Sequence, residues 1–543
     1  MPAWCSAAQP HAVATGHGDG WSSAVSSGVL HTSSPAEDEA VTGTTAAAGA
    51  PGRHMWRITW SVATLVVAAV MIGMLPLVVR RVGNADYWWH IVTAHWILDH
   101  HALPTHDLYT YTVPTHQWID HEYLSELLMY GLGKMGGQLA VSLGFGAITW
   151  AGFWFILART NLRPTHVVAT ASGLGLAAVA GVSVWGPRPQ MITFALVCVE
   201  LYLIERFLER GHRGFYAMPL IVLAWANFHG GFIIAFLFLG IAFGVEAVRW
   251  LMDRSRVESR VRAGRIALVS VASLVTGLVN PHGFALYTYA WRTQTSAVQQ
   301  AFIREWQSPD FHALEIRGFE AMIILLLIGL AMRRARPTVF SVVVAVTGLL
   351  LALQSVRHIA IFVATATPLL AWTWSATLTD VGRRCSALVS RLSPRRVLGA
   401  VGTVTAVIAV VVLVALRSLL AHQAASTVDN YPSRAADYLD AHASVGTRMF
   451  SDYAWGGYMV YRFYPEQSRR VFLFGEADLM GDTIMNEYVD VVGLHSNWLD
   501  ILNRHGVDYV VFEPDTPLTS ALATQPGWHL VYSDTVAVVY VRG

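Results

Sequence analysis

The sequence predicts a polytopic α-helical membrane protein of about eleven spans, followed by an extracytoplasmic α/β domain. Hydrophobic residues make up 54% of the chain and charged residues only 13%, a balance that ordinary soluble globules do not have. Long uncharged apolar runs recur through residues 55–420. After residue 426 the pattern changes to short apolar runs separated by polar turns, which is typical of a soluble domain.

Residues 1–54 are rich in Ala, Ser, Thr, Gly and His and have no periodicity that could bury a face. We expect a disordered tail. Because it lacks the basic and apolar regions of a secretory signal, the first apolar run is expected to be a retained helix. Met55 stands directly before this run and is an alternative start to Met1.

The transmembrane part is expected within residues 55–420, where apolar runs have the length that crosses a bilayer. The predicted spans are 58–79, 138–158, 165–185, 190–208, 215–228, 231–251, 265–280, 318–332, 338–355, 358–376 and 398–416. The fifth and sixth could instead form one hairpin that is broken at Asn227–Gly231.

Arginine residues predict the orientation. Alternate loops hold most of them, for example the loop from Arg249 to Arg265, and such loops face the cytoplasm. The protein is therefore expected in the cytoplasmic (inner) membrane, with its N-terminus on the cytoplasmic side. With an odd number of spans, the large first loop, residues 80–137, and the domain of residues 426–543 are expected outside.

The first outer loop is the strongest candidate for chemistry. It holds the acids Asp86, Asp120 and Glu122 together with His90 and His121, among many Trp and Tyr residues. Acidic, imidazole and aromatic groups are the materials of a sugar or phosphate site. The alternative is a solvated loop whose aromatic residues lie at the membrane interface, where Trp and Tyr are enriched.

Further polar residues fall at the outer ends of the predicted spans, where they could converge on one cavity. They are Arg188, Asn227, His229, His282, Arg304, Glu305, Arg357 and His358. Taken singly, each could end a helix or lie at the interface. Ionisable groups within or beside spans are nevertheless costly and indicate function by default.

The remaining composition excludes several classes of function. A formal net charge of +1 gives no reason to expect nucleic acid as a partner. Cys5, Cys198 and Cys385 fall in a tail, an apolar run and a basic loop, so neither a disulfide framework nor a thiolate metal site is expected.

The C-terminal domain is expected to alternate helices and strands. The predicted elements are helices at 433–442, 497–505 and 517–524, strands at 448–453, 470–474 and 507–512, and a hairpin of 528–532 with 536–541. Within Tyr453–Tyr458, the rings of Trp455 and Tyr458 could stack on a sugar or could belong to the core.

Four segments carry a resemblance to a known family. They are Asp86–His90 (DYWWH), Trp118–Glu126 (WIDHEYLSE), Trp225–Gly231 (WANFHGG) and Trp455–Tyr458 (WGGY). Together with the long first outer loop and the outer α/β domain, they make the chain resemble the GT-C superfamily of polyprenyl-phosphate-sugar-dependent membrane glycosyltransferases. More narrowly, it looks like a group of bacterial membrane proteins of that type, over nearly everything after residue 55.

The resemblance implies sugar transfer from a polyprenyl-phosphate donor to a cell-envelope glycan, lipid or protein at the outer face of the cytoplasmic membrane. An acid of the first outer loop is the base or metal ligand in that superfamily, and Asp86 matches its position. No second acid adjoins Asp86, so Asp120 or Glu122 would have to complete a pair in space. A divalent cation, Mg²⁺ or Mn²⁺, is the candidate cofactor, with Asp86, His121 and Glu122 as candidate ligands.

An outer-face arginine should hold the lipid phosphate bidentately, with Arg357 as the first choice and then Arg188 and Arg304. Two other classes stay open. A lipid or saccharide transporter or flippase would be expected to have an internal repeat and a polar route across the membrane, which the sequence does not suggest. A non-catalytic scaffold of GT-C-like shape is the other alternative.

Overall fold

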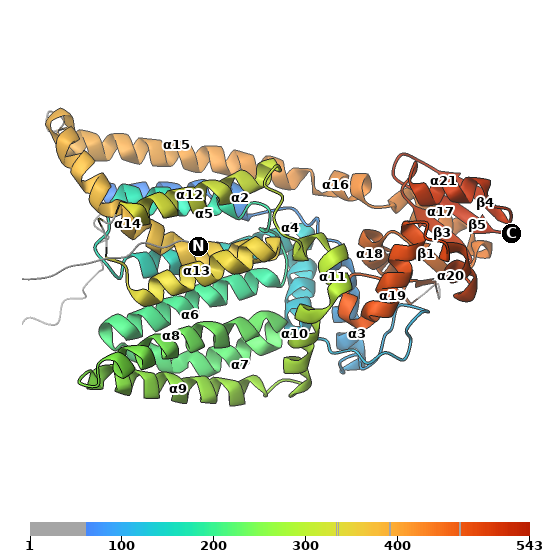
Figure 1. Ribbon diagram of the computed structural model, residues 1–543. Coiled ribbons are helices and arrows are strands. Elements are labelled where there is room, and N and C mark those ends of the chain that lie inside the picture. The colour runs from blue at the N-terminus through green and yellow to red at the C-terminus, as the bar shows by residue number, and fades with distance from the viewer. Residues whose placement is uncertain (1–60, 333, 335, 390–392, 466–468) are drawn as a thin grey trace, which may run out of the picture. The chain divides into compact units, whose positions relative to one another are not determined.

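The computed structural model describes residues 61–543 except residues 333, 335, 390–392 and 466–468 (Figure 1). The predicted tail and both candidate starts lie outside the described residues. Residues 60–543 form one compact unit. Helices dominate this unit, and its strands all follow residue 447.

Every apolar run that the sequence marks as a span is helical. The helices are α1 (Val62–Gly73), α2 (Leu75–Val78), α4 (Tyr123–Thr160), α5 (Val167–Ala180), α6 (Gln190–Arg210), α7 (Met218–Phe228), α8 (Ile233–Met252), α9 (Val257–Gly277), α12 (Arg317–Ala331), α13 (Val339–Gln354), α14 (Ile359–Val389) and α15 (Pro394–Ala421). Within the described residues, four helical segments are long and apolar enough to cross a membrane, and three shorter apolar ones accompany them. These helices support a multi-pass membrane protein, whereas the number eleven and the orientation stay predictions.

Two interruptions shape the end of the bundle that carries the candidate site. Gly136 and Gly137 break α4, and the positive φ of 62° at Gly137 is a conformation that favours glycine. His229 separates α7 from the short η2 (Gly230–Phe232), which leads into α8. Helices α7 and α8 are therefore separate, and the interruption lies where the sequence predicts a break, at Asn227–Gly231.

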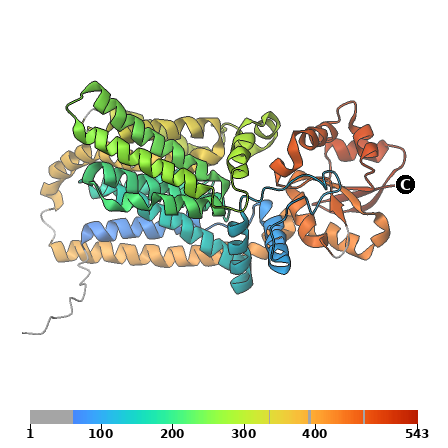
Figure 2. The ribbon, with the colours of Figure 1, turned by 90° about the horizontal axis from the view of Figure 1, so that it is seen from below.

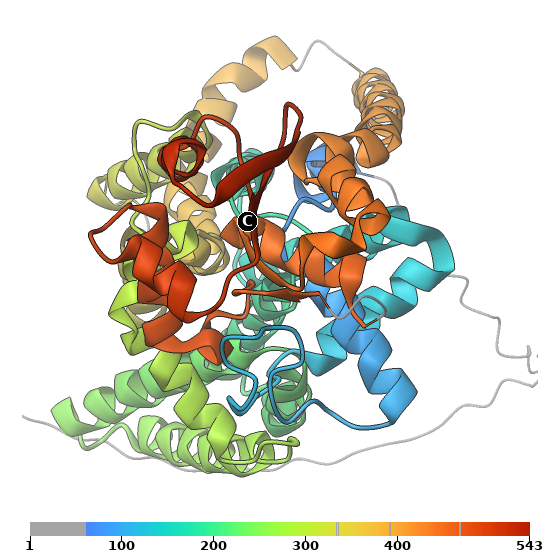
Figure 3. The ribbon, with the colours of Figure 1, turned by 90° about the vertical axis from the view of Figure 1, so that its right-hand side faces the viewer.

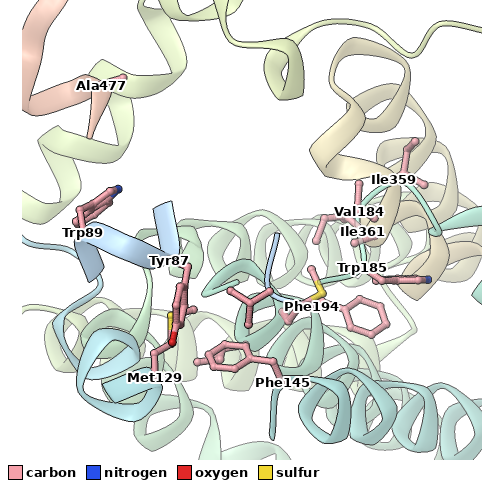
Figure 4. Close-up of a cluster of buried hydrophobic side chains, with 14 of the residues drawn as sticks. Tyr87, Trp89, Met129, Phe145, Val184, Trp185, Phe194, Ile359, Ile361 and Ala477 are labelled. Atoms are coloured by element: carbon pink, nitrogen blue, oxygen red, sulfur yellow. The ribbon is translucent and has the colours of Figure 1, made fainter. Parts of the chain in front are cut away.

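The bundle is held by apolar packing and by one buried ionic network. Figure 4 shows Tyr87 beside Met129 and Phe145, and Trp185 beside Phe194, within the hydrophobic core. In Figure 2 α1 and α15 run side by side, in agreement with their contacts. The ion pair of Arg159 Nε with Glu205 Oε2, at 2.6 Å, ties α4 to α6. Removing one partner of so deeply buried a pair typically costs about 3–5 kcal/mol.

The C-terminal residues form a five-stranded sheet in the order β2-β1-β3-β5-β4 (Figure 3). Its strands are β1 (Arg448–Ser451), β2 (Arg470–Val471), β3 (Tyr509–Phe512), β4 (Trp528–Ser533) and β5 (Val538–Arg542). Strand β1 pairs in parallel with β2 and β3, whereas β5 is antiparallel to β3 and β4. Its helices are α17 (Ser433–Ala441), α18 (Tyr453–Phe463), α19 (Ala477–Val492), α20 (Trp498–Arg504) and α21 (Pro517–Thr524).

These elements follow the predicted pattern with several differences, among them α18, which was not predicted, and the strand expected at 470–474, which ends at Val471. The strand expected at 448–453 ends at Ser451, because Asp452 caps α18 by accepting the N–H of Ala454 at 2.9 Å. The sequence analysis also missed α19, whose helical pattern is broken at Gly481. The domain boundaries proposed from the sequence stay predictions.

The first loop connects the helical bundle to this sheet. After α3 (Asp86–His100), the chain runs beside β2, where Thr110 forms a bridge with Val471. Helix α3 itself packs against α18. Residues of the first loop and of the C-terminal sheet therefore meet at the same end of the bundle.

Candidate functional site

Asp86 is the first residue of α3, but it does not cap that helix. Ala85 holds the capping position, and Asp86 Oδ1 instead accepts the indole N–H of Trp89 at 3.2 Å. The carboxylate is half-buried. Its pKa is raised to about 6, first by burial and then by Glu305. At neutral pH a carboxyl group with such a pKa is mostly ionised and still basic enough to accept a proton.

Close packing against the C-terminal residues fixes this part of α3. The buried ring of Trp88 lies edge-on to Tyr458, with 5.1 Å between the ring centroids. Gly457 faces Trp89 so closely that a Cβ atom there would contact the indole ring at 2.9 Å. Gly475 lies against the carboxylate of Asp86, where any side chain would overlap with it. The C-terminal residues thus form one wall of the Asp86 site.

Two of the predicted phosphate-binding arginines lie near this wall. Arg188 forms an ion pair with Glu305 in η3 (Arg304–Trp306), and the pKa of Asp86 responds to both groups. Arg357, in η5 (Val356–His358), places its guanidinium 4.2 Å from the centroid of the Trp306 ring. Among the described side chains it forms no salt bridge. Arg357 is therefore a cation that is oriented by stacking and whose charge lowers the pKa of Glu305, without forming a salt bridge among the described side chains.

A second cluster surrounds Glu122, which precedes α4. Three imidazoles from separate segments approach its carboxylate: His121 at 2.8 Å, His229 at 3.3 Å and His90 at 3.5 Å. His90 also lies 2.9 Å from Glu126, one turn further along α4. The sequence predicts His90, His121 and Glu122 in one loop and names His229 as a residue that could converge on them, and the structure brings His229 from the distant α7–α8 junction to Glu122.

The charges of this cluster divide into an ion pair and neutral neighbours. Burial would lower the pKa of His121, but Glu122 and Glu476 outweigh it and raise this pKa to about 9. Burial would raise the pKa of Glu122, yet His121 and the other imidazoles hold it well below its usual range. The pKa of His90 falls to about 4 because burial disfavours its charged form. At neutral pH the cluster therefore contains a His121 imidazolium paired with a Glu122 carboxylate.

Asp120 lies apart from this ion pair although it is close in sequence. Its Oδ1 accepts the backbone N–H of Glu122 at 3.2 Å, whereas the buried Oδ2 has no hydrogen-bond partner. Burial raises the pKa of Asp120 to about 7. The Nε2 of His282 donates to the backbone oxygen of Asp120 at 3.0 Å, so this histidine holds the segment in place.

Sequence reasoning missed two residues that complete the cluster. Tyr289, on α10 (Ala285–Thr295), donates to Glu476 Oε1 at 3.2 Å and lies 3.4 Å from His121 Nε2. Burial raises the pKa of Glu476 to about 8. Neither residue belongs to a motif of the first loop, and only the folding of α10 and α19 onto it brings them there.

The other predicted site residues have different positions. Asn227 accepts the Tyr123 hydroxyl at 2.7 Å and donates to the backbone of α7, which is a structural role. Arg304 is exposed. The ring of His358 lies edge-on to Trp306, with 6.1 Å between the centroids. Trp455 and Tyr458 are buried in the aromatic core beside α3, so the sequence analysis rightly kept a core role open for them.

The candidate metal ligands do not form one donor set. Asp86 is hydrogen-bonded to Trp89, whereas His121 and Glu122 form an ion pair with each other. His229 Nδ1 accepts the backbone N–H of Gly231 at 2.9 Å, which assigns the proton of this ring to Nε2, the atom that faces Glu122. Mg²⁺ and Mn²⁺ prefer oxygen ligands. Within the described part of the chain, no group of three or more His, Cys, Asp or Glu side chains is arranged to hold a metal ion, so these residues do not fit such a cation.

No protein-family model matches the sequence, and no curated protein matches it. Among solved structures, the chain is similar to ArnT from Cupriavidus metallidurans bound to undecaprenyl phosphate, with 16% identity over 88% of this chain and 97% of that one, and a TM-score of 0.48. It is also similar to the apo oligosaccharyltransferase of Archaeoglobus fulgidus, with 12% identity over 90% and 75% of the two chains and a TM-score of 0.48.

A third similar structure is the arabinofuranosyltransferase AftD from Mycobacteria, with 16% identity, a TM-score of 0.44, and coverage of 89% of this chain and 40% of that one.

Proposed function

We propose that the protein is a membrane glycosyltransferase that moves a sugar from a polyprenyl-phosphate donor to an acceptor hydroxyl, with Asp86 as the base. One observation carries the proposal. Asp86, with a pKa of about 6, is only partly buried at the start of α3 and lies within electrostatic range of the Arg188–Glu305 pair. A base and a cationic group at the end of an apolar bundle are what transfer from a lipid phosphate needs.

The reaction is a single displacement. The acceptor oxygen forms a bond to the anomeric carbon of the donor sugar while the bond between that carbon and the phosphate oxygen breaks. Asp86 takes the proton of the acceptor hydroxyl, and polyprenyl phosphate leaves with the electron pair of the broken bond. Ion pairing by an arginine would stabilise the negative charge that grows on the phosphate.

Arg357 and Arg188 are the proposed phosphate ligands. Arg357 has a guanidinium oriented by Trp306, and it acts on Glu305 by charge without forming a salt bridge among the described residues, so its N–H donors would be available to an anion. Arg188 would exchange or share its partner Glu305 with the phosphate. The distribution of arginine residues supports an outer-face site on the cytoplasmic membrane. The acceptor would be a cell-envelope glycan, lipid or protein.

The test is a transfer assay with the purified full chain in lipid nanodiscs. A panel of radiolabelled polyprenyl-phosphate hexoses and pentoses is supplied with a cell-envelope extract, and release of polyprenyl phosphate is measured. At least one donor should be consumed by the wild type. Asp86→Asn should lose about 10²-fold or more of that rate, because an amide cannot accept the proton.

Asp99→Asn is the matched control, since Asp99 lies at the far end of α3, exposed and paired only with His95. It should transfer at the wild-type rate. A folded Asp86→Asn protein with a near-normal rate would remove the base role from Asp86. Movement of an intact lipid-linked sugar across the nanodisc or vesicle bilayer, with no donor cleaved, would indicate a transporter instead.

A further inference from the structure

A polar cavity of about 320 Å³ is lined in part by Glu476, the residue after the Gly475 that packs on Asp86. Its walls come from the first loop at Gln117–Ile119, from α10, from α11 (Ala297–Phe302) and from α19. Figure 1 shows α10 and α11 beside α19, in agreement with their contacts. The volume is of the size that a sugar unit or a small disaccharide occupies, and of its lining only Tyr289 and Glu476 belong to the cluster described above.

Three acidic side chains contribute to the lining of this cavity. Asp478 and Asp482 line it together with a single cation, Arg292. Glu476 also lines it, and its pKa of about 8 leaves it mostly protonated at neutral pH until a cation enters. Amide and hydroxyl groups supply the other polar atoms, and they come from Gln117, Gln299, Thr295, Ser296 and Tyr289. The lining of the cavity therefore offers many hydrogen-bond acceptors and few positively charged hydrogen-bond donors. An anion entering it would meet unfavourable charge, whereas hydroxyl and ammonium groups would find acceptors.

The carboxylates of α19 are held in position by side chains of the opposite wall. Thr293 donates to Asp478 Oδ2 at 2.8 Å, and Gln299 donates to its Oδ1 at 3.1 Å. Ser296 donates to Asp482 Oδ1 at 2.7 Å. Because each carboxylate oxygen can accept two hydrogen bonds, these contacts orient the groups and leave acceptor capacity for a ligand.

The cavity shares a wall with the histidine cluster. The hydroxyl of Tyr289, which lines the cavity, lies within hydrogen-bonding distance of both Glu476 and His121. Glu476 directly follows Gly475, the residue packed on Asp86. A ligand in the cavity would therefore lie beside the residue that follows Gly475, and an acceptor hydroxyl could extend from there towards the base.

We propose that this cavity binds the acceptor, and that the acceptor is a hydroxyl-rich glycan that carries no phosphate or carboxylate and is bound more tightly when it carries an amine. The inference rests on the proposed transfer activity and adds to it the class of acceptor. Carboxylates fixed at two points recognise neighbouring hydroxyls or an ammonium group by paired hydrogen bonds.

Binding is measured with the full chain in nanodiscs by isothermal titration calorimetry, in the absence of any donor. The probes are cellobiose, the fully deacetylated disaccharide of glucosamine, and cellobiose 6-phosphate. The aminated probe should bind most tightly and the phosphorylated one about tenfold or more weakly than cellobiose. Equal affinity for the phosphorylated probe, or no binding of cellobiose and the aminated probe, would overturn the proposal.

Variants locate the binding in this cavity. Asp478→Asn and Asp482→Asn should each reduce the preference for the aminated probe by about tenfold. Asp500→Asn, at an exposed position of α20 outside the cavity, is the matched control and should bind like the wild type. Unchanged preference in both cavity variants would place the binding elsewhere and refute the assignment.

Different experimental results would refute the proposed transfer activity and the proposed acceptor cavity. Asp86→Asn should retain the binding of the probes, because Asp86 lies outside the cavity lining. Probe binding without cleavage of any donor would leave the cavity assigned and remove the transfer function. The opposite result is a protein that cleaves the donor with anionic acceptors and does not bind the neutral and aminated probes. That result would support the transfer activity and refute the proposed class of acceptor.

Discussion

Gly475 packs directly against the carboxylate of Asp86, so a close neighbour of the proposed base comes from the C-terminal part of the chain. The hydroxyl of Tyr453 donates to the carbonyl oxygen of Gly475 at 3.3 Å and holds this backbone in place. A β-carbon at position 475 would overlap with Asp86 Oδ1, and either the backbone or the carboxylate would have to move. The base is therefore positioned by two segments nearly four hundred residues apart.

Gly475→Ala should lower the transfer rate strongly without preventing folding. Displacement of a reacting group by about 1 Å can cost about 10²-fold in rate. The measurement is donor cleavage, with thermal unfolding recorded on the same samples. Gly131→Ala in α4 is the control, because a β-carbon there meets no atom within 4 Å. A fully active Gly475→Ala protein would show that Asp86 does not need its present position.

The helices could be predicted because their signal is local. Apolar runs of membrane length and polar interruptions are both read from neighbouring residues, and each predicted run is helical. Asp86, His90, His121 and Glu122 were found for the same reason, since they lie in one loop. Their roles in catalysis and substrate binding stay predictions.

Contacts between distant segments could not be predicted from the sequence. Glu476 and Tyr289 belong to α19 and α10, and nothing in their surroundings distinguishes them from other polar residues. Asp120 or Glu122 was expected to complete an acidic pair with Asp86, and Glu122 has other partners. In the structure its carboxylate contacts three imidazoles, one of them from the α7–α8 junction. Which partner a carboxylate finds depends on tertiary packing.

The transfer rate should depend on pH with a bell shape. It should rise as pH passes through about 6, because Asp86 must be deprotonated to accept a proton. It should fall near pH 9, where His121 loses the proton that pairs it with Glu122. The measurement is the initial rate of donor cleavage at saturating substrate. A rate that is flat from about pH 5 to about pH 7 would contradict the base role of Asp86.

Stability should also depend on the His121–Glu122 pair. The pKa of His121 is about 9 in the folded chain against an ordinary value of 6.5, so its contribution is fully present below pH 6.5 and is lost as pH rises through about 9. The shift corresponds to about 3 kcal/mol of unfolding free energy. His121→Gln should remove this loss. The measurement is the free energy of unfolding by denaturant in detergent micelles, recorded against pH for the variant and the wild type. Parallel curves for the two proteins would refute the contribution of the His121–Glu122 pair.

The predicted orientation can be tested with fusions. A reporter that is active only outside the cytoplasm should work when it is fused after Gly543. The same reporter should be silent when it is inserted near Arg260, in the most arginine-rich loop. The opposite pattern would place the Asp86 site on the cytoplasmic side and would require a donor on that leaflet.

Arg357→Lys should weaken donor binding while the chemical step changes little. Lysine keeps the positive charge but cannot stack its head group flat on Trp306 or offer a planar pair of donors to a phosphate. The KM for the polyprenyl-phosphate sugar should therefore rise about tenfold, with kcat near the wild-type value. Arg317→Lys is the matched control, since Arg317 is exposed and pairs with Glu320 at 2.7 Å, three residues further along α12. If Arg357→Lys and Arg317→Lys both leave the donor KM unchanged, Arg357 does not hold the phosphate, and Arg188 becomes the remaining cation near Asp86 to test.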